Sequence, residues 1–201
     1  RSSDLFAKQL LGIDLRGVRS EQELIHRCEQ YKAKHPNLKF VVGQGWDQTM
    51  WAGQELPTNE QLNALFPGIP VCLYRVDGHA ALVNDFLIKK SQLIDQIPSL
   101  QGGEVVLKKQ ILEGNLSLPS NVNLPTNAKF GQKIILQTYR PSGVLIDNAI
   151  NIVQPFLPNY TRKEYVKALL QVQDELLQYG ITGVHEAGRN PHVLDEPSRQ
   201  R

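Results

Sequence analysis

Short runs of β-forming residues alternate with capped helical segments along the first half of the chain. Strands are predicted over residues 38–42 and 71–75, because each run is short, rich in β-forming residues and followed by a glycine-containing loop. Helices are predicted over 20–35 and 58–65, since each begins with a Ser/Thr-x-x-Glu/Gln capping box. A third helix is predicted over 80–94, where apolar residues recur at helical spacing. This alternation of strand, loop and helix predicts an α/β fold.

The second half of the chain is less regular. Residues 99–133 are polar and contain two prolines, Pro119 and Pro125, which favours an elaborated loop or a small inserted subdomain. A hairpin is predicted next, with strands over 133–139 and 144–146 around a type I turn at 140–143. Further predicted elements are a helix over 147–157, a helix from the capping box at Thr161–Glu164 to Gly180, and a short strand over 181–184. The chain therefore divides into segments 1–98, 99–143 and 144–188 and a polar tail, 189–201.

The composition is that of an ordinary globular chain, and it excludes several classes of protein. The 201 residues carry 22 Lys and Arg against 20 Asp and Glu, a net charge of +2, so no basic excess points to nucleic acid. The sequence has no run of about 18 apolar residues, so no membrane span is predicted. The N-terminus has neither an initiator Met nor an apolar signal stretch, so we expect a processed or excised chain in the cytoplasm. Cys28 and Cys72 are expected to be buried thiols, with a disulfide between them as the open alternative.

Three predicted strands end in loops that carry polar side chains. The loops are Trp46-Asp47, Asp77-Gly78-His79 and His185-Glu186. Ligands bind at the carboxyl edge of the sheet in α/β folds, so these loops form the candidate site. The alternative is that the loops are polar only because the chain reaches water there.

Asp77 and His79 are the sharpest of these candidates. An aspartate beside a histidine can fix the tautomer of the imidazole and raise its basicity, and Gly78 allows the loop to bend. The alternative is that either side chain caps the helix predicted to follow.

The other two loops carry weaker signals. Trp46 and Trp51 lie near Asp47 and can form a ligand wall with a polar handle, or they can simply cover the core. His185 and Glu186 can act as an acid and base, although neighbours at a strand end point to opposite faces. The sequence has no His-x-His, His-Glu-x-x-His or Gly-x-Ser-x-Gly motif, so no metal-ligand set or nucleophile triad is predicted.

An ordered set of motifs resembles one family of metal-dependent amidohydrolases. The segments are IDLRGV at 13–18, GQGWDQ at 43–48, PVCLYRVDGHAA at 70–81 with Asn84, GVLIDNA at 143–149, and GITGVHEAG at 180–188. Together they span nearly the whole chain, and their order makes the resemblance specific. The chain is similar to the branch typified by N-substituted formamide deformylase, in the third subfamily of the amidohydrolase superfamily.

The resemblance implies that the chain is an internal fragment of a (β/α)₈ barrel. It would begin just after the His-x-His of the first barrel strand and end just after the second strand. It would then consist mainly of the α+β subdomain inserted between these strands, which in the family lies over the barrel mouth and shapes the substrate pocket. The family's metal ligands have no counterpart here, so no metal ligand is assigned. A divalent metal, most often zinc, is expected only in the full-length parent.

The resemblance also implies a parent enzyme that hydrolyses amide or other non-peptide C–N bonds of a small molecule. The candidate catalytic residues are Asp77 and His79, and the candidate substrate-binding residues are Trp46, Asp47, Arg75, His185 and Glu186. The fragment would be inactive alone, and its exposed strand edges would favour a homo-oligomer. Two alternatives stay open: a stand-alone module that binds small molecules through Trp46 and Trp51, and a structural cap without catalysis.

Overall fold

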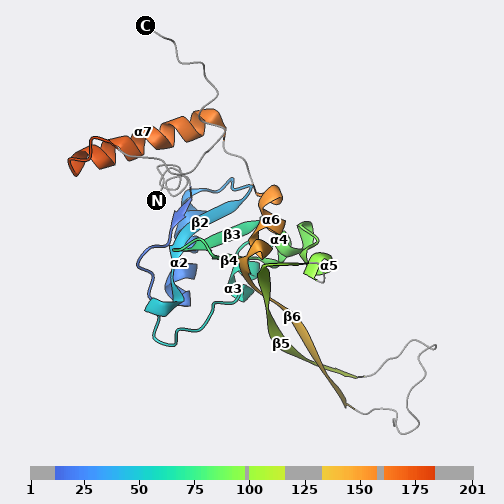
Figure 1. Cartoon of the computed structure of the whole chain (residues 1–201). Helices are drawn as coiled ribbons and strands as arrows, with labels where there is room; N and C mark the ends of the chain where they lie inside the picture. Colours follow the sequence, from blue (N-terminus) through green and yellow to red (C-terminus); the bar gives the residue numbers. More distant parts are fainter. Residues whose placement is uncertain (1–11, 98–99, 116–132, 158–160, 184–201) are drawn as a thin grey trace.

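The computed structural model describes residues 12–97, 100–115, 133–157 and 161–183. Within these residues, six strands form one open sheet in the order β1-β2-β3-β4-β6-β5 (Figure 1). The strands are β1 (Ile13–Asp14), β2 (Val41–Trp46), β3 (Val71–Arg75), β4 (Ala80–Val83), β5 (Gly103–Asn115) and β6 (Lys133–Asp147). Strands β1 to β3 are parallel, whereas β4, β6 and β5 are antiparallel to their neighbours. The predicted α/β class is confirmed as a mixed α/β sheet.

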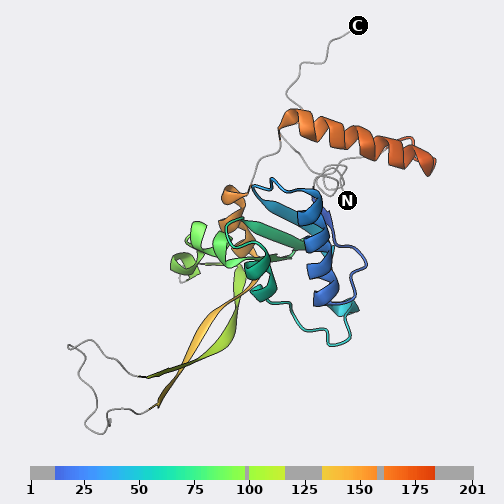
Figure 2. The same cartoon turned by 180° about the vertical axis from the view of Figure 1, so that it is seen from behind.

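Helices cover both faces of this sheet (Figure 2). The helices are α2 (Glu21–Lys34) and α3 (Glu60–Leu65) on one face, and α4 (Asp85–Lys90), α5 (Leu93–Gln96) and α6 (Asn148–Val153) on the other. Successive residues of a strand point to opposite faces. Leu73 therefore packs in the cluster with α2 and α3, and its neighbour Cys72 packs in the cluster with α4 to α6.

The two cysteines lie in different core clusters, on opposite faces of the sheet. Cys28 of α2 belongs to the first cluster and Cys72 to the second, and both are free and buried. The prediction of two buried thiols is confirmed. Burial raises the pKa of each thiol to about 12, because the apolar surroundings disfavour the thiolate.

The capping boxes predicted the starts of the two long helices correctly. Ser20 caps α2 by accepting a hydrogen bond from the backbone N–H of Glu23. Thr161 and Glu164 form a reciprocal capping box at the start of α7 (Arg162–Gln178), and Gly180 follows its end with φ +73°. These signals work because each is complete within four residues of sequence.

Strand β2 begins later than predicted and continues through the residues expected to form a loop. Gly43 and Gly45 lie inside the strand, between β1 and β3. A Cβ on Gly43 would lie 2.9 Å from the Leu73 side chain and 3.1 Å from the Ile13 carbonyl oxygen. This glycine therefore marks a close approach of neighbouring strands and not a turn. The short helix η1 (Gln48–Met50) follows β2.

The helix predicted over 80–94 is wrong in its first part. Residues 80–83 form β4, which pairs with β3 and β6 and is buried along its whole length. A short continuous apolar run fits a buried strand as well as a helix, and here strand pairing decides. Asn84 then caps α4, and its amide also bonds to Phe66, Ile69 and Val71, so its polar atoms are satisfied in the core.

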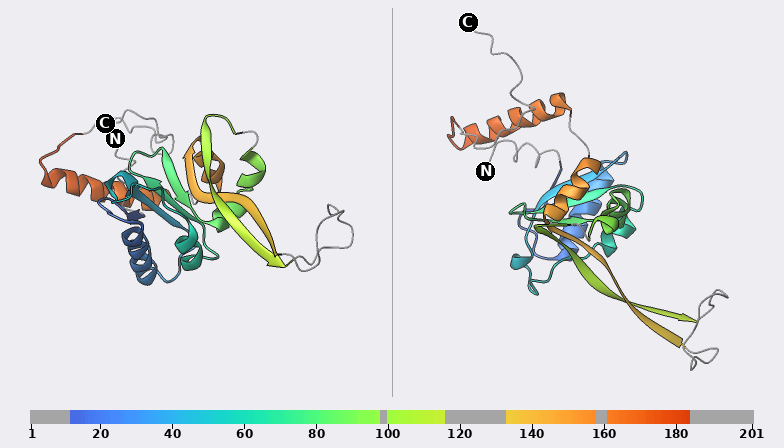
Figure 3. Two further views of the ribbon diagram at one scale, coloured as in Figure 1. Left: turned by 90° about the horizontal axis from the view of Figure 1, so that it is seen from below. Right: turned by 45° about the vertical axis from the view of Figure 1, so that its right-hand side comes forward.

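The loop predicted over 99–133 is wrong for residues 103–115, whereas residues 116–132 lie outside the described residues, and the hairpin around 140–143 is also wrong. Residues 103–115 form β5, and β6 runs unbroken from residue 133 to 147 opposite it. The two strands form a long arm that leaves the body of the sheet (Figure 3). Pro141 sits next to an irregularity in the pairing between Val105 and Leu107, where a missing N–H is tolerated. Because β6 also pairs with β4, the sheet contains residues of segments 1–98, 99–143 and 144–188.

Two further features complete the described structure. The helix predicted over 147–157 is confirmed as α6 followed by η3 (Gln154–Phe156). The strand predicted over 181–184 is wrong for residues 181–183, which have no regular structure, and Val184 lies outside the described residues. No helix in the described part of the chain is long and apolar enough to cross a membrane.

Candidate functional site

Charged side chains from several strands meet at one end of the sheet. The carboxyl ends of the parallel strands β1, β2 and β3 lie at the same edge. Because β4 is antiparallel to β3, and β6 to β4, β4 begins and β6 ends at this edge. Two backbone hydrogen bonds hold the loops together there, from Val76 N–H to the Trp46 carbonyl and from Asp147 N–H to the His79 carbonyl, both with N···O distances of 2.9 Å.

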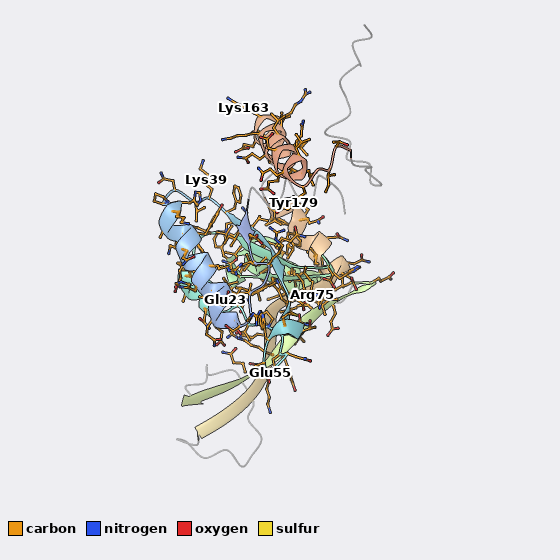
Figure 4. The ribbon with its side chains drawn as sticks, turned by 90° about the vertical axis from the view of Figure 1, so that its left-hand side faces the viewer. Glu23, Lys39, Glu55, Arg75, Lys163 and Tyr179 are labelled. Carbon is orange, nitrogen blue, oxygen red and sulfur yellow. The ribbon has the colours of Figure 1, made fainter. Side chains whose placement is uncertain are left out.

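Arg75 and Asp77 form a two-pronged ion pair at the end of β3 (Figure 4 labels Arg75). The Arg75 Nε and Nη2 atoms donate to the two Asp77 carboxylate oxygens at 2.9 and 2.7 Å. Asp77 also accepts the backbone N–H of His79 at 3.1 Å, which Gly78 permits by its φ of +78°. The guanidinium lowers the pKa of Asp77, and the carboxylate raises that of Arg75.

His79 is held by a different aspartate. Its ring atom Nδ1 lies 2.8 Å from the Asp147 carboxylate, and both side chains are exposed, by 71% and 48%. The sequence predicted that Asp77 would orient this imidazole, but Asp77 contacts Arg75 and the His79 backbone instead. We call the four residues Arg75, Asp77, His79 and Asp147 the β3 corner.

Asp147 is the residue that sequence reasoning missed. It precedes α6, where an aspartate usually caps the helix, and the sequence predicts it as the start of a helix and as part of the GVLIDNA segment, without a role in the site. Its side chain makes no capping hydrogen bond, and its backbone has φ +49° and ψ −120°. Its partner His79 is 68 residues away in sequence, so no local pattern could have revealed the contact.

A second ion pair of the same design lies at the end of β1. Arg16 Nε and Nη2 donate to the two Asp14 carboxylate oxygens at 2.9 and 2.7 Å, and the Arg16 backbone N–H donates to Asp14 at 3.0 Å. Arg27 donates to the backbone carbonyls of both residues. We call Asp14 and Arg16 the β1 corner.

The structure places both tryptophans in the core. Trp46 is fully buried and its indole N–H donates to the Leu73 carbonyl at 2.7 Å. Trp51 is 7% exposed and donates to the Val18 carbonyl at 3.1 Å. The expected Trp46 ligand wall is therefore corrected to a core contact, because β2 extends through Trp46 and carries the indole inward.

The remaining predicted site residues divide into one that is described and two that are not. Asp47 accepts hydrogen bonds from the backbone and the hydroxyl of Thr49, so it caps η1. Its charge also contributes to the raised pKa of Arg75. His185 and Glu186 lie outside the described residues, and their assignment stays a prediction.

The described residues do not provide a metal centre. No group of three or more His, Cys, Asp or Glu side chains within 12–97, 100–115, 133–157 and 161–183 is arranged to hold an ion. At the β3 corner, Asp77 is occupied by Arg75, which leaves only the His79–Asp147 pair. A catalytic metal takes about three protein ligands. The His79 and Asp147 side chains are only two, and they are bonded to each other, so they do not fit such an ion.

An apolar groove lies apart from the β3 corner, along α7 and the residues after it. Its lining includes Leu169, Val172, Leu176 and Leu177, and it contains no titratable side chain. The charged side chains of the β3 corner are not part of this lining.

Comparisons with known proteins found a matching family model and similar curated proteins. The model of the Amidohydrolase family matches residues 4–111, more than half of the chain. Two similar curated proteins are Protein LONG AFTER FAR-RED 3 of Arabidopsis thaliana, 29% identical over 194 residues and 94% of this chain, and Putative amidohydrolase YtcJ of Bacillus subtilis (strain 168), 22% identical over 175 residues and 87% of this chain. The chain spans 28% of the length of each of these relatives.

Two solved structures are also similar. They are uncharacterized metal-dependent hydrolases from Pyrococcus horikoshii OT3 and Pyrococcus furiosus, each 22% identical, with TM-scores of 0.48 and 0.46. In both cases the match covers 89% of this chain and 28% of the other chain. The family model, which covers the β3 strand and the Asp77–His79 loop, is what decides the assignment: the chain belongs to the amidohydrolase family.

Proposed function

We propose that this chain walls the substrate pocket of a metal-dependent hydrolase, and that the substrate is a small molecule with an amide or other non-peptide C–N bond. The observation that carries the proposal is the meeting of Arg75, Asp77, His79 and Asp147 at the carboxyl edge of the sheet. Family membership supplies the reaction class. In this proposal the mixed sheet is the α+β subdomain inserted between the first two strands of a (β/α)₈ barrel of the formamide deformylase type.

Hydrolysis of a C–N bond needs an activated water, a polarised carbonyl and a proton for the leaving nitrogen. In metal-dependent hydrolases the ion, often zinc, supplies the first two. The described residues of this chain offer no ligand set for that ion, so their contribution is to bind the substrate and to handle protons. His79 is suited to handling protons, because its imidazole is 71% exposed at the carboxyl edge of the sheet, where we expect the substrate to bind.

Arg75 and Asp47 are the residues that we assign to substrate binding on the same edge. Asp77 engages the Arg75 Nε and Nη2 atoms, so the other guanidinium N–H groups can donate to a substrate carbonyl. His185 and Glu186, which lie outside the described residues, are assigned to the same wall because they belong to the segment at 180–188 that resembles the family.

The test compares two double variants of the complete gene product. Asp77→Ala with His79→Ala removes the β3 corner, and Asp14→Ala with Arg16→Ala removes the β1 corner, which has the same ion-pair geometry. Release of amine is measured from a panel of small N-formyl and N-acyl amines, with and without a chelator. We expect chelator-sensitive turnover that falls by about 100-fold or more in the first variant and changes little in the second.

Other results would favour other functions. If the wild-type protein releases no amine from any member of the panel in a chelator-sensitive way, the hydrolase assignment is contradicted. If a folded β3-corner variant turns over normally, the chain is a structural cap. Tight, stoichiometric binding of panel members without turnover would instead identify a small-molecule binding module.

A further inference from the structure

Asp147 has a backbone conformation that is costly for any residue with a Cβ atom. Its φ of +49° and ψ of −120° match the first central position of a type II′ turn, which glycine dominates. Such strain persists where the surrounding structure enforces it, and it concentrates at functional sites. The chain therefore carries an aspartate where glycine would be easier to accommodate.

The surroundings of Asp147 fix its position on both sides. Its backbone N–H donates to the His79 carbonyl at 2.9 Å, which continues the pairing of β6 with β4. On the other side, Asp147 pairs with Gly103 of β5. Its carboxylate is thereby aimed at the His79 imidazole instead of at the free N–H groups of α6.

The contact between the two side chains determines where the imidazole proton lies. A carboxylate can only accept hydrogen bonds, so at 2.8 Å the proton in this contact belongs to His79 Nδ1. In the neutral ring Nε2 then carries the lone pair, and the ring is 71% exposed. Asp77 does not orient the ring, since its oxygens accept from Arg75 and from the His79 backbone N–H and the ring nitrogen is bonded to Asp147.

We propose that Asp147 is a positioning residue that holds His79 as the Nδ1–H tautomer and leaves Nε2 open to the substrate. This inference rests on the proposed hydrolase function. In the reaction, a water molecule gives a proton to His79 Nε2 as its oxygen forms a bond to the substrate carbonyl carbon, and the ring becomes an imidazolium beside the Asp147 carboxylate. The same proton passes to the leaving nitrogen as the C–N bond breaks, which restores the neutral ring.

The first test reads the tautomer directly in the complete gene product labelled with ¹⁵N-histidine. Nitrogen chemical shifts distinguish Nδ1–H from Nε2–H, and a His79→Gln variant assigns the signal. We expect Nδ1–H as the main neutral form in the wild type and its loss in Asp147→Ala. Asp147→Asn keeps an oxygen acceptor, so it should restore the Nδ1–H form. A wild-type ring that is mainly Nε2–H, or an unchanged tautomer in Asp147→Ala, would overturn the proposal.

The second test separates positioning from mere stability. Asp147→Gly removes the backbone strain together with the carboxylate, so we expect the melting temperature to rise by about 2–4 °C. The value of kcat should nevertheless fall on the order of 10- to 100-fold, which is the usual cost of removing a residue that orients a functional histidine ring. A lower melting temperature, or an unchanged kcat, would overturn the proposal.

Gln92 provides the matched control for that experiment. It also has a positive φ, +51°, but it lies at the start of α5 and makes no contact with the β3 corner. Gln92→Gly should leave kcat unchanged, and a loss of kcat in this variant would contradict the assignment of the effect to Asp147. If the wild-type protein lacks hydrolase activity but shows the Nδ1–H form, the proposed function fails while the positioning of His79 stands.

Discussion

The β1 corner and the β3 corner contain the same ion pair and differ in what surrounds it. In each, an arginine and an aspartate two residues apart form hydrogen bonds of 2.9 and 2.7 Å, and the aspartate also accepts a backbone N–H. Beside the β1 pair lie the Arg27 guanidinium and the backbone of Gly45. Beside the β3 pair lie an exposed histidine and a strained aspartate.

This difference shows that an arginine–carboxylate pair at a strand end is not by itself a sign of function. At the β1 corner the pair closes a loop, because Asp14 accepts the Arg16 backbone N–H and the Arg27 guanidinium donates to the backbone carbonyls of both residues, while Glu175 acts on Arg16 electrostatically and contributes to its raised pKa. At the β3 corner the Arg75–Asp77 pair fixes the backbone of His79, a residue with a titratable side chain. The pair holds its loop in both places, and under the proposed function only the β3 pair contributes to chemistry.

The largest expected effect concerns the glycines beside the two pairs. Gly45→Ala should destabilise the fold by about 3 kcal/mol, because its φ is +114° and the new Cβ would lie 2.8 Å from the Arg16 nitrogen. Gly78→Ala meets no atom within 4 Å and should cost only about 1 kcal/mol for its left-handed backbone. Urea unfolding of both variants measures the difference, and equal costs would show that the β1 corner is not tightly packed.

The next effect is a difference in enzyme activity between variants of Arg75 and Arg16. Lysine cannot reproduce the forked contact, so Arg75→Lys and Arg16→Lys should each lower stability by less than about 1 kcal/mol. Only Arg75→Lys should also lower kcat/KM, on the order of tenfold, because a displaced imidazole is poorly aligned. Steady-state kinetics on the complete gene product give the comparison. A similar loss in Arg16→Lys would remove the distinction between the corners.

The smallest effect is a pH dependence that the corners share. Hydrogen bonds from arginine lower the pKa of Asp14 and of Asp77 below the ordinary value of 3.8. Each carboxylate therefore stabilises the fold above that value, and the contribution is lost as the pH falls through the lowered pKa. Both pairs are partly exposed, so each should contribute less than about 1 kcal/mol.

Asn substitutions test this shared effect. Asp14→Asn and Asp77→Asn should each make the loss of stability between pH 5 and pH 2 less steep, as followed by urea midpoints. The two variants should differ in turnover at neutral pH, where only Asp77→Asn changes it. If neither substitution alters the loss of stability between pH 5 and pH 2, the two ion pairs do not form in solution.

The sequence predicted the parallel strands β2 and β3 and the two long helices better than β1 and the antiparallel strands. Helices α2 and α7 were located by capping boxes, whose bonds are complete within four residues. Strands β4 and β5 are not predicted, and β6 is predicted as the two strands of a hairpin, because the identity of these strands depends on pairing between distant segments. Ala80 pairs with Ile146, for example, and no local pattern distinguishes this apolar run from a helix.

The candidate site shows the same limit. Asp77 and His79 are candidates because they follow one predicted strand, whereas Arg75, the last residue of that strand, is a candidate only through the family resemblance. Asp147 was missed because its contact with His79 joins the end of β6 to the start of β4. The predicted position of Trp46 is wrong because of Gly43. The sequence suggests that this glycine allows a turn, whereas in the structure it allows neighbouring strands to approach closely.

The most direct test of the account replaces two equally accessible histidines in the complete gene product. His79 is 71% exposed at the β3 corner, and His26 is 64% exposed on α2, beside Glu29 and Gln30. The measurement is kcat/KM for His79→Gln and His26→Gln with the best substrate of the amide panel. The account predicts a loss of about 100-fold or more for His79→Gln and no change for His26→Gln. Equal values for the two variants would contradict it.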